Sequence, residues 1–303
     1  MTEIVQQLVN GLALGSIYAL IALGYTMVYG VLRFINFAHS DVLMLGAFAA
    51  FYLAPALTPM LGAASIPLAL AVIILSAAIC ACIGMLIEFL AYRPLRSRPR
   101  LTVLITAIGV SLLIEFTGQH EKVFGAAPRS FPTLLPHGDV GFGSLHIAST
   151  DLVVLVLTAV LLAAMWFIVQ KTKLGMAMRA VSYNEQAAAL MGVNVNRVIS
   201  FTFGLGSALA AVAGIFYAMR SPTIEPLMGI QPGLRAFIAA VVGGIGNLPG
   251  AALGGIVLGL IETIFGGLPG MSKYRDGIAF AILILILLFR PSGLLGKTQI
   301  EKV

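Results

Sequence analysis

Long stretches of this sequence contain no charged residue, and they constrain its fold more than any other feature. These stretches cover residues 42–87, 152–170, 198–219, 236–261 and 277–289. Several of them match or exceed the roughly 20 apolar residues that cross a bilayer as a helix. Lipid offers no hydrogen-bond partner to a peptide group, and the period-two alternation of membrane strands is absent, so each crossing must be a helix. We therefore predict an all-α integral membrane protein.

The composition agrees with this class. Hydrophobic residues make up 59% of the 303 residues and charged residues 10%, with a mean hydropathy of +1.02, whereas soluble domains carry about 25% charged residues. The N-terminal stretch MTEIVQQLVNGLALG has no basic region and no clear cleavage site, so we interpret it as a retained first span. A net charge of +6 is compatible with nucleic-acid binding. Basic residues in a membrane protein more often mark cytoplasmic loops, so we expect no nucleic-acid partner.

Basic residues fall into clusters that orient the chain. They are Arg93, Arg96, Arg98 and Arg100; Lys171, Lys173 and Arg179; and Arg290, Lys297 and Lys302. The positive-inside rule assigns all three regions to the cytoplasm. Residues 118–150 lie between two of these clusters and must face outward. We expect a single transmembrane domain over 1–303, with a cytoplasmic loop at about 170–197 and an outer loop at about 118–150.

Segments of spanning length predict about 8–9 transmembrane helices. The candidates are 5–30, 40–58, 66–91, 101–117, 151–169, 198–219, 234–248, 251–267 and 276–289. Nine crossings would put the N-terminus outside and the C-terminus in the cytoplasm. The seventh candidate, within AFIAAVVGGIGNLPG, is short and interrupted by glycines, so we predict a broken or re-entrant helix there.

A faint internal repeat accompanies this layout. Residues 14–25 resemble 205–216, and residues 47–50 resemble 236–240. The offset is about five spans, and an odd offset implies an inverted repeat, which is common in transporters. Chance similarity between helices rich in alanine, glycine and leucine is an equal alternative. Glycines recur four residues apart, a spacing that favours close helix packing. They are Gly11 and Gly15; Gly246, Gly250 and Gly254; and Gly255 and Gly259.

The polar passage VSYNEQAAALMGVN, residues 181–194, carries the signals of a short helix. Ser182 and Glu185 form a capping box, and Gly192 is suited to the left-handed conformation that ends a helix, so we predict about nine helical residues. Its apolar face is too small for firm adsorption to a membrane. That face consists of Ala187, Ala188, Leu190 and Met191. Two interpretations stay open: a connecting helix at the membrane surface, or a contact for a cytoplasmic partner.

Two interruptions of the apolar pattern are candidates for a translocation path. One is NFAHSD, residues 36–41, at the cytoplasmic start of the second span, and the other is GGIGNLP, residues 243–249. Helix ends and freed backbone groups at such breaks could steer a zwitterionic substrate without buried charges. Equally, both stretches could simply terminate helices. The candidate path residues are Asn36, Phe37, His39, Asp41, Gly243, Gly244, Gly246 and Asn247.

Several segments together resemble a known family. Residues 175–218 resemble the cytoplasmic loop of permease subunits of ABC importers, in which an E-A-A-x-x-x-G pattern forms the helix that couples to the ATPase. Further segments are similar to the branched-chain amino acid permease family, closest to its LivH-type subunit, and the resemblance covers nearly the whole chain. These segments are GLALGSIYALIALGYTMVYG, FINFAHSDVLMLGAF, AYRPLRS, AFIAAVVGGIGNLPGAALGGIVLGLIE and FRPSGLLG.

The resemblance implies a single permease domain in the cell (inner) membrane that imports branched-chain amino acids. It implies a homologous second permease subunit, two ABC ATPase subunits that bind ATP and magnesium, and a periplasmic or extracellular substrate-binding protein. It implies no cofactor bound by this chain. The coupling residues it implies are Arg179, Ser182, Glu185, Gln186, Ala187, Ala188, Leu190 and Gly192.

The sequence departs from the family pattern at two positions. Gln186 occupies the position of the family's glutamate, with Glu185 one residue early. Either residue could therefore serve in coupling. Ser40 stands where the family has glycine, which we expect to stiffen the turn into the second span.

Enzymatic and metal-binding functions find little support. PSGLLGKT, residues 291–298, resembles a phosphate-binding loop, but Pro291 replaces the first glycine and no strand precedes it, so we expect no ATP hydrolysis by this chain. Cys80 and Cys82 point in different directions on one helix and are expected to serve packing. A metal site at His137, Asp139 and His146 is less probable than a solvated outer loop.

The strongest rival class is an ion-coupled secondary transporter, which usually keeps ionisable residues inside the membrane. Glu88, Glu115 and Glu262 lie near the ends of their predicted spans, which favours an externally driven permease. Urea and short amides, carried by similar permeases, remain alternative substrates.

Overall fold

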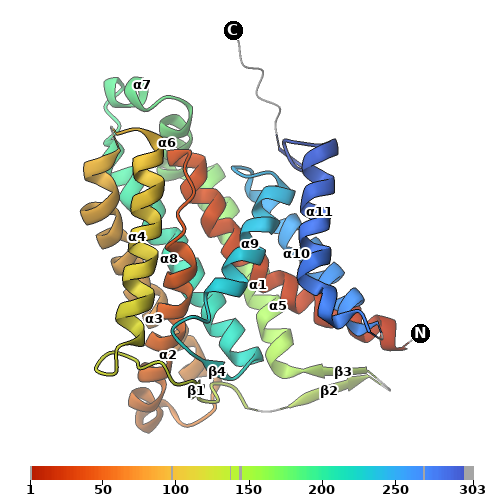
Figure 1. Cartoon of the computed structure of the whole chain (residues 1–303). Coiled ribbons are helices and arrows are strands. Elements are labelled where there is room, and N and C mark those ends of the chain that lie inside the picture. The colour runs from red at the N-terminus through yellow and green to blue at the C-terminus, as the bar shows by residue number, and fades with distance from the viewer. Residues whose placement is uncertain (1, 97, 137, 143–144, 269, 297–303) are drawn as a thin grey trace.

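A computed structural model describes residues 2–296 apart from 97, 137, 143–144 and 269. These residues form a bundle of long helices with small strand pairs at one end (Figure 1). The helices are α1 Thr2–Leu32, α2 His39–Leu61, α3 Ile66–Ile87, α4 Arg100–Gln119, α5 Ser149–Lys171, α6 Lys173–Tyr183, α7 Glu185–Leu190, α8 Val195–Arg220, α9 Ile230–Gly243, α10 Leu248–Gly267 and α11 Arg275–Phe289. The strands are β1 Arg129–Ser130, β2 Asp139–Phe142, β3 Leu145–Ala148 and β4 Thr223–Ile224, paired antiparallel as β1 with β4 and β2 with β3.

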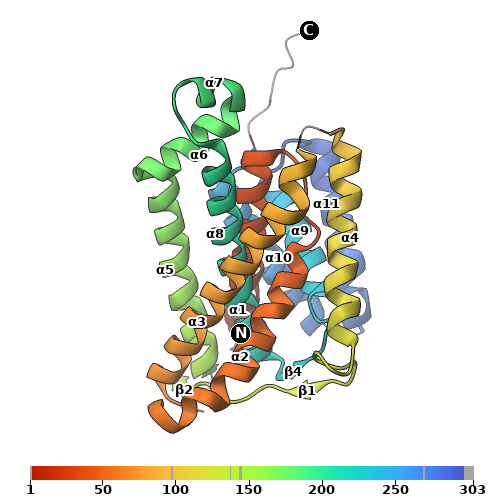
Figure 2. The same ribbon diagram turned by 90° about the vertical axis from the view of Figure 1, so that its left-hand side faces the viewer.

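The all-α membrane class is confirmed. Among the described residues, seven helices are long and apolar enough to cross a membrane, namely α1, α2, α3, α4, α5, α8 and α10. The shorter α9 and α11 occupy the places of the seventh and ninth predicted spans. Figures 1 and 2 show α7 and the end of α11 at one end of the bundle, with all four strands at the other.

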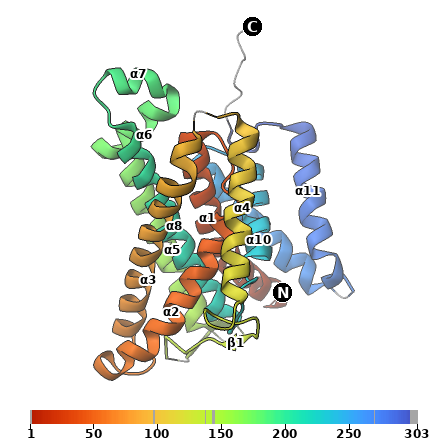
Figure 3. The same cartoon turned by 60° about the vertical axis from the view of Figure 1, so that its left-hand side comes forward.

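Two helices form the centre of the bundle. In the most apolar stretch of each helix, 89% of α1 and 78% of α8 is buried, against 17% of α4 and 22% of α5. Figure 3 shows α4 and α11 on the outside of the bundle. The outer helices α4 and α5 therefore expose apolar side chains on the surface of the bundle, while α1 and α8 are enclosed by protein.

Helix packing agrees with the expected inverted repeat. The helix α1 packs on α10 as α8 packs on α3, and α2 packs on α3 as α9 packs on α10. Contacts between α1 and α9 likewise correspond to those between α8 and α2. The helices α1 and α8 run in opposite directions through the bundle (Figure 1). The contacts of α1–α3 therefore correspond to those of α8–α10, as an inverted repeat requires.

Small residues bring the repeat helices into close contact. A methyl group added at Gly259 of α10 would overlap the Cα atom of Gly15 in α1, and one at Gly254 would overlap the carbonyl oxygen of Ala239 in α9. The spacing thus serves backbone approach, as expected. Gly246 is the exception, because it lies in the loop between α9 and α10 with a φ of 92°.

The seventh span differs from its predicted bounds. The prediction was 234–248, whereas α9 covers Ile230–Gly243 and ends where Gly244 adopts a φ of 104°. Its 14 residues rise only about 21 Å as a helix, less than the roughly 30 Å hydrocarbon thickness. The third span also continues beyond α3, through a π-helical turn at Glu88–Tyr92 and a 3-10 turn at Arg93–Leu95.

Cys80 is buried in α3 with its thiol 3.9 Å from the carbonyl oxygen of Val42, and Cys82 is exposed. Both are free thiols, and Cys80 has the packing role that we expected. His137 lies outside the described residues. Among the described residues, no three His, Cys, Asp or Glu side chains are grouped to hold a metal ion.

Candidate functional site

The predicted coupling loop folds into an elbow of two helices, and the sequence prediction missed α6. Thr172 caps α6 by accepting a hydrogen bond from the Gly175 amide at 3.1 Å. Gly175 lies so close to the Val169 carbonyl oxygen that a side chain would not fit. Arg179 donates to the same carbonyl. Arg179 therefore stabilises, from inside this chain, the bend between α5 and the first helix of the elbow, α6.

The second helix of the elbow is shorter than predicted and has a different cap. Its amide at Ala187 donates to the Oδ1 atom of Asn184 at 2.9 Å, so Asn184 is the N-cap, and α7 has 6 residues. Ser182 belongs to α6, and its hydroxyl donates to a distant carbonyl, that of Gly30. Asparagine and serine cap helices equally well, so local sequence did not separate them. Gly192 has a φ of 85°, as expected for the residue that ends the helix.

The apolar face of α7 also differs from the prediction. Ala188 is only 5% exposed and packs toward the chain's own core, so it is not part of the outward face. Leu190 is 88% exposed and Met191 85%. Ala187 is exposed as well, together with Glu185 and Gln186. Of the predicted apolar face, Ala187, Leu190 and Met191 therefore point outward, and the exposed Ala189 lies beside them.

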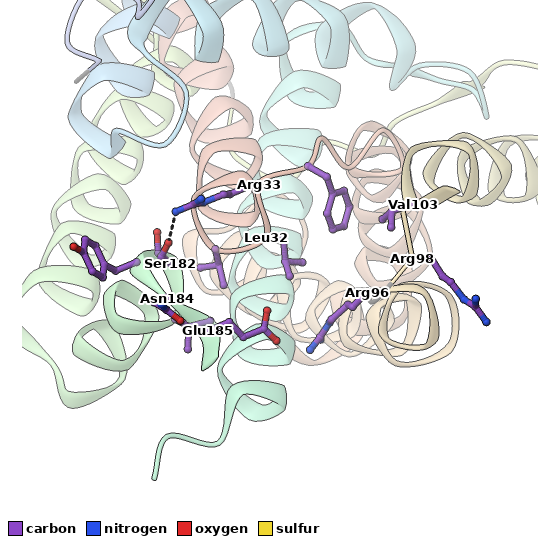
Figure 4. A pocket seen from close by; sticks show the side chains of 12 residues that line it. Leu32, Arg33, Arg96, Arg98, Val103, Ser182, Asn184 and Glu185 are labelled. Atoms are coloured by element: carbon purple, nitrogen blue, oxygen red, sulfur yellow. Dashed lines mark hydrogen bonds between the residues drawn. The ribbon is translucent and has the colours of Figure 1, made fainter. Parts of the chain in front are cut away.

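Hydrogen bonds tie this elbow to the end of α1. Ser182 donates through its hydroxyl to Gly30, and Arg33 donates through Nη2 to the carbonyl oxygen of Ser182 at 3.1 Å (Figure 4). Arg33 has a φ of 57°, a left-handed conformation that is uncommon outside glycine. Arg33 directly precedes the chain segment that leads into the first predicted path region.

The first predicted path region, NFAHSD, runs into the interior of the bundle. Figure 1 shows α2 beginning deeper than the point where α1 ends. Asn36 is 6% exposed, and its Oδ1 atom accepts a hydrogen bond from the Tyr92 hydroxyl at 2.6 Å. His39 lies with its ring centre 4.7 Å from that of Tyr25, against a glycine, Gly24, that leaves it room. Phe37 is half-buried beside them.

Buried polar atoms at the start of α2 lack partners. His39 and Asp41 are each 1% exposed, and neither the Nε2 atom of His39 nor the Oδ2 atom of Asp41 has a hydrogen-bond partner among the described residues. The same holds for the hydroxyl of Thr26 on α1. An unpaired buried polar atom costs about 1–3 kcal/mol, and buried polar groups are normally paired, which makes this region a functional candidate.

Ser40 occupies the turn next to these residues. Its hydroxyl donates to the Phe37 carbonyl at 2.9 Å, a bond that glycine could not make. Its side chain packs directly on Gly233 of α9 and its carbonyl oxygen on Gly229 just before α9, so a Cβ atom at either glycine would overlap Ser40. Glycines on the neighbouring segment thus make room for the serine.

The second predicted break is held by the segment after α11. Asn247 caps α10 by accepting from the Gly250 amide at 3.2 Å, and its side-chain nitrogen donates to the Leu295 carbonyl. The Leu295 amide in turn donates to the Gly243 carbonyl at 3.1 Å. Gly244 and Gly246 take left-handed φ angles between these contacts. This break therefore anchors the C-terminal segment.

The end of α1 lies near the predicted coupling loop and near the second predicted break. A methyl group at Gly30 would lie 3.9 Å from the Cα atom of Gly246 in the second break, and the Gly30 carbonyl binds Ser182 of the elbow. The structure therefore brings the coupling loop and the second break to one helix end. The side chains of Asn36 and Asn247 are not joined by any described hydrogen bond.

Ionisable residues form two buried networks that the sequence did not reveal. At the end of α3, Glu88 is fully buried and binds Arg93 at 3.1 Å, Arg96, and the Ser200 hydroxyl of α8. The network ties α3 to the start of α8. In the sequence, the only hint of this network was the position of Glu88 near the end of a predicted span.

The second network joins four helices, α1, α9, α10 and α11. Glu262 of α10 is 4% exposed, and its carboxylate binds Arg235 of α9 at 2.8 Å and the Tyr18 hydroxyl of α1 at 2.8 Å. Arg235 also binds Asp276 of α11 at 2.7 Å. A buried carboxylate in an apolar helix predicts some partner. Which residue pairs with Glu262 depends on which helices pack against α10.

Inverted repeats of membrane-spanning helices are a common plan of transporters, and the packing of these helices fits that plan. Residues 7–287 match the family described as branched-chain amino acid transport system / permease component. The chain belongs to this family, and the LivH-type resemblance is confirmed.

Relatives are similar over nearly the full length. The chain is 43% identical over 306 residues to the high-affinity branched-chain amino acid transport system permease protein BraD of Pseudomonas aeruginosa, covering 98% of this chain and 97% of the relative. It is 39% identical over 303 residues, with the same coverage, to the permease protein LivH of Escherichia coli. A probable LivH of Methanocaldococcus jannaschii is 29% identical over 93% of this chain and 89% of the relative. No solved structure is significantly similar.

Proposed function

We propose that this chain is the permease subunit of an ATP-driven importer for branched-chain, aliphatic amino acids. The substrate follows from BraD and LivH, both named as high-affinity branched-chain amino acid transport permeases. The protein acts in the cell (inner) membrane, with its N-terminus outside and its C-terminus in the cytoplasm. An external binding protein delivers the substrate, and a homologous permease subunit completes the path.

The observation that carries the ATP-driven part is the link between the elbow of α6 and α7 and the end of α1. Leu190 and Met191 project from the elbow into solvent, although apolar side chains gain from burial. Behind them, Ser182 is hydrogen-bonded to Gly30 and to Arg33. A force applied to α7 would therefore reach the end of α1 through Ser182 at the end of α6.

In this mechanism two ATPase subunits bind ATP and magnesium, and this chain binds no cofactor. Closure of the ATPases moves α7, and the hydrogen bonds of Ser182 carry the movement to α1. The segment that follows α1 leads to Asn36, His39 and Asp41, whose buried polar atoms face a changed environment when α1 shifts. The movement thereby opens or closes the path for substrate.

The proposal is tested by placing a charge on the outward face of α7. Ala187→Glu and Leu190→Glu put an unpaired charge into a desolvated contact, which costs several kcal/mol, so we expect loss of ATPase copurification and of substrate-stimulated hydrolysis. Leu227→Glu is the matched control, because Leu227 is 41% exposed near β4 at the opposite end. Retention of the ATPase and normal stimulation by both α7 variants would refute the coupling role.

A second measurement addresses substrate and energy source. Cells lacking the chain should lose uptake of labelled leucine and keep uptake of labelled urea, whereas loss of urea uptake alone would favour an amide permease. The ion-coupled alternative has one observation in its favour, the buried pair of Glu262 and Arg235. These groups neutralise each other, so we expect leucine uptake into reconstituted vesicles to require ATP and to survive an uncoupler.

A further inference from the structure

The helix α3 continues into a π-helical turn, Glu88–Tyr92, a rare form that is frequent at functional sites. In such a turn an amide bonds to the carbonyl five residues before it, and the Arg93 amide donates to the Glu88 carbonyl in this way. Glu88 and Tyr92, at the two ends of the turn, contact different neighbours. This end of α3 is therefore a junction between segments that are far apart in the sequence.

One neighbour of the junction is the start of α8. Glu88 is fully buried, and its carboxylate binds Arg93 at 3.1 Å and Arg96. It also accepts a hydrogen bond from the Ser200 hydroxyl of α8. The Arg96 Nη1 atom donates to Asn196, again on α8, at 2.9 Å. A buried carboxylate is held firmly by such partners, because losing one would leave its charge uncompensated.

The other neighbour is the first path region, NFAHSD. Tyr92 is fully buried, and its ring centre lies 5.4 Å from that of Phe34 and 5.4 Å from that of Phe203 on α8. The Tyr92 hydroxyl donates to the Oδ1 atom of Asn36 at 2.6 Å. A movement of the end of α3 would therefore displace the Asn36 side chain.

A cavity separates this junction from α7. It has a volume of about 310 Å³, and Arg96 and Glu185 both line it and point toward each other (Figure 4). Glu185 attracts Arg96 electrostatically, although no ion pair joins the two within the described part of the chain. Movement of α7 toward the end of α3 would narrow the cavity and bring these opposite charges together.

We propose that the end of α3 is a second coupling route, in which Glu185 of α7 closes on Arg96 and Tyr92 then repositions Asn36. The inference rests on the proposed function, because the ATPase subunits supply the movement of α7. Glu185 and Tyr92 are positioning residues in this route, since each acts on the path through another residue. The route runs beside the link from Ser182 to the end of α1.

The test uses the complex of this chain with its permease and ATPase partners, reconstituted in vesicles. Tyr92→Phe removes only a hydroxyl, so we expect leucine transported per ATP hydrolysed to fall roughly fivefold or more, with ATPase copurification unchanged. Glu185→Gln should act in the same way, because it removes the charge that closes on Arg96. Adding Tyr92→Phe to Asn36→Ala should cause no further loss, since the hydroxyl then has no partner to position.

A matched control distinguishes this route from the loss of any hydroxyl. Tyr52→Phe removes a hydroxyl that accepts from Arg129 at 3.1 Å near the outer end of α2, and it should leave the transport ratio unchanged. A native ratio in Tyr92→Phe would overturn the route through Asn36. Loss of ATPase copurification in Glu185→Gln would overturn the pairing with Arg96, because Glu185 would then contact the ATPase.

Spin labels measure the closure itself. Tyr183→Cys and Arg98→Cys place labels on two segments that line the cavity, after replacement of Cys80 and Cys82 by alanine. Trapping the complex with ATP and orthovanadate should shift the distance between the labels to shorter values, and an unchanged distance would refute the closure. Failure of the proposed function would look different, because the native complex would then transport leucine without ATP.

Discussion

Buried polar atoms without partners gather where the chain passes from α1 to α2. Asp41, His39 and Thr26 each contribute one such atom, and each side chain is 1% exposed. Helix packing alone gives no reason to keep these groups, since apolar residues of similar volume would avoid the desolvation cost. A transported molecule, or water that accompanies it, would supply the missing partners.

The first prediction concerns Asp41. Asp41→Asn keeps the shape of the side chain and removes its ability to ionise, so we expect leucine uptake to fall about tenfold or more at equal abundance in the membrane, equivalent to at least ~1.4 kcal/mol. Ser76→Ala is the control, because the Ser76 hydroxyl is also buried without a described partner but lies on α3. Uptake that merely follows protein abundance in both variants would indicate a structural role for Asp41.

At the scale of elements, glycine-lined crossings hold the repeat together. The backbones of α1 and α10 approach at Gly15 and Gly259 so closely that even a methyl group would overlap. By contrast, Gly109 on the peripheral α4 has open space around the position of a Cβ atom. The same substitution should therefore have opposite effects at two helical glycines.

The second prediction compares these positions. Gly259→Ala should lower the free energy of unfolding by about 1–3 kcal/mol through overpacking. Gly109→Ala should raise it by about 0.5–1 kcal/mol, because alanine loses less backbone entropy in a helix. Thermal unfolding of the two purified variants in one detergent measures the difference. Equal melting temperatures would mean that α1 and α10 do not cross at Gly259.

At the scale of the whole molecule, the elbow and the strands mark opposite ends. The elbow of α6 and α7 stands at one end and the pairs formed by β1 to β4 at the other (Figures 1 and 2). Basic clusters in the sequence assign the elbow to the cytoplasm. Once the membrane side of the elbow is known, the membrane side of every other loop follows from it.

The third prediction tests that orientation. After replacement of Cys80 and Cys82 by alanine, Ser130→Cys on β1 should react with an impermeant thiol reagent on intact cells, while Tyr183→Cys should react only after lysis. Both positions are exposed, so accessibility within the protein does not limit either reaction. Labelling of Tyr183→Cys but not Ser130→Cys on intact cells would reverse the topology.

Sequence alone determined the membrane class, the long spans and the two segments that interrupt the apolar pattern between helices. Lipid offers the backbone no hydrogen-bond partner, so an apolar stretch of spanning length indicates at least one helical crossing. The left-handed end of α7 at Gly192 was predictable for the same kind of local reason, since glycine adopts that conformation without strain. The polar residues of the breaks were predictable too, as interruptions of an apolar pattern.

Only the tertiary structure decided which residues meet across the bundle. Ser182 had the sequence of a helix cap, yet its hydroxyl binds Gly30, 152 positions earlier. Ala188 had the pattern of an outward face, yet it packs inward. Glu262 and Arg235 pair because α9 and α10 lie side by side. Such contacts depend on the arrangement of whole helices, which no local pattern of residues encodes.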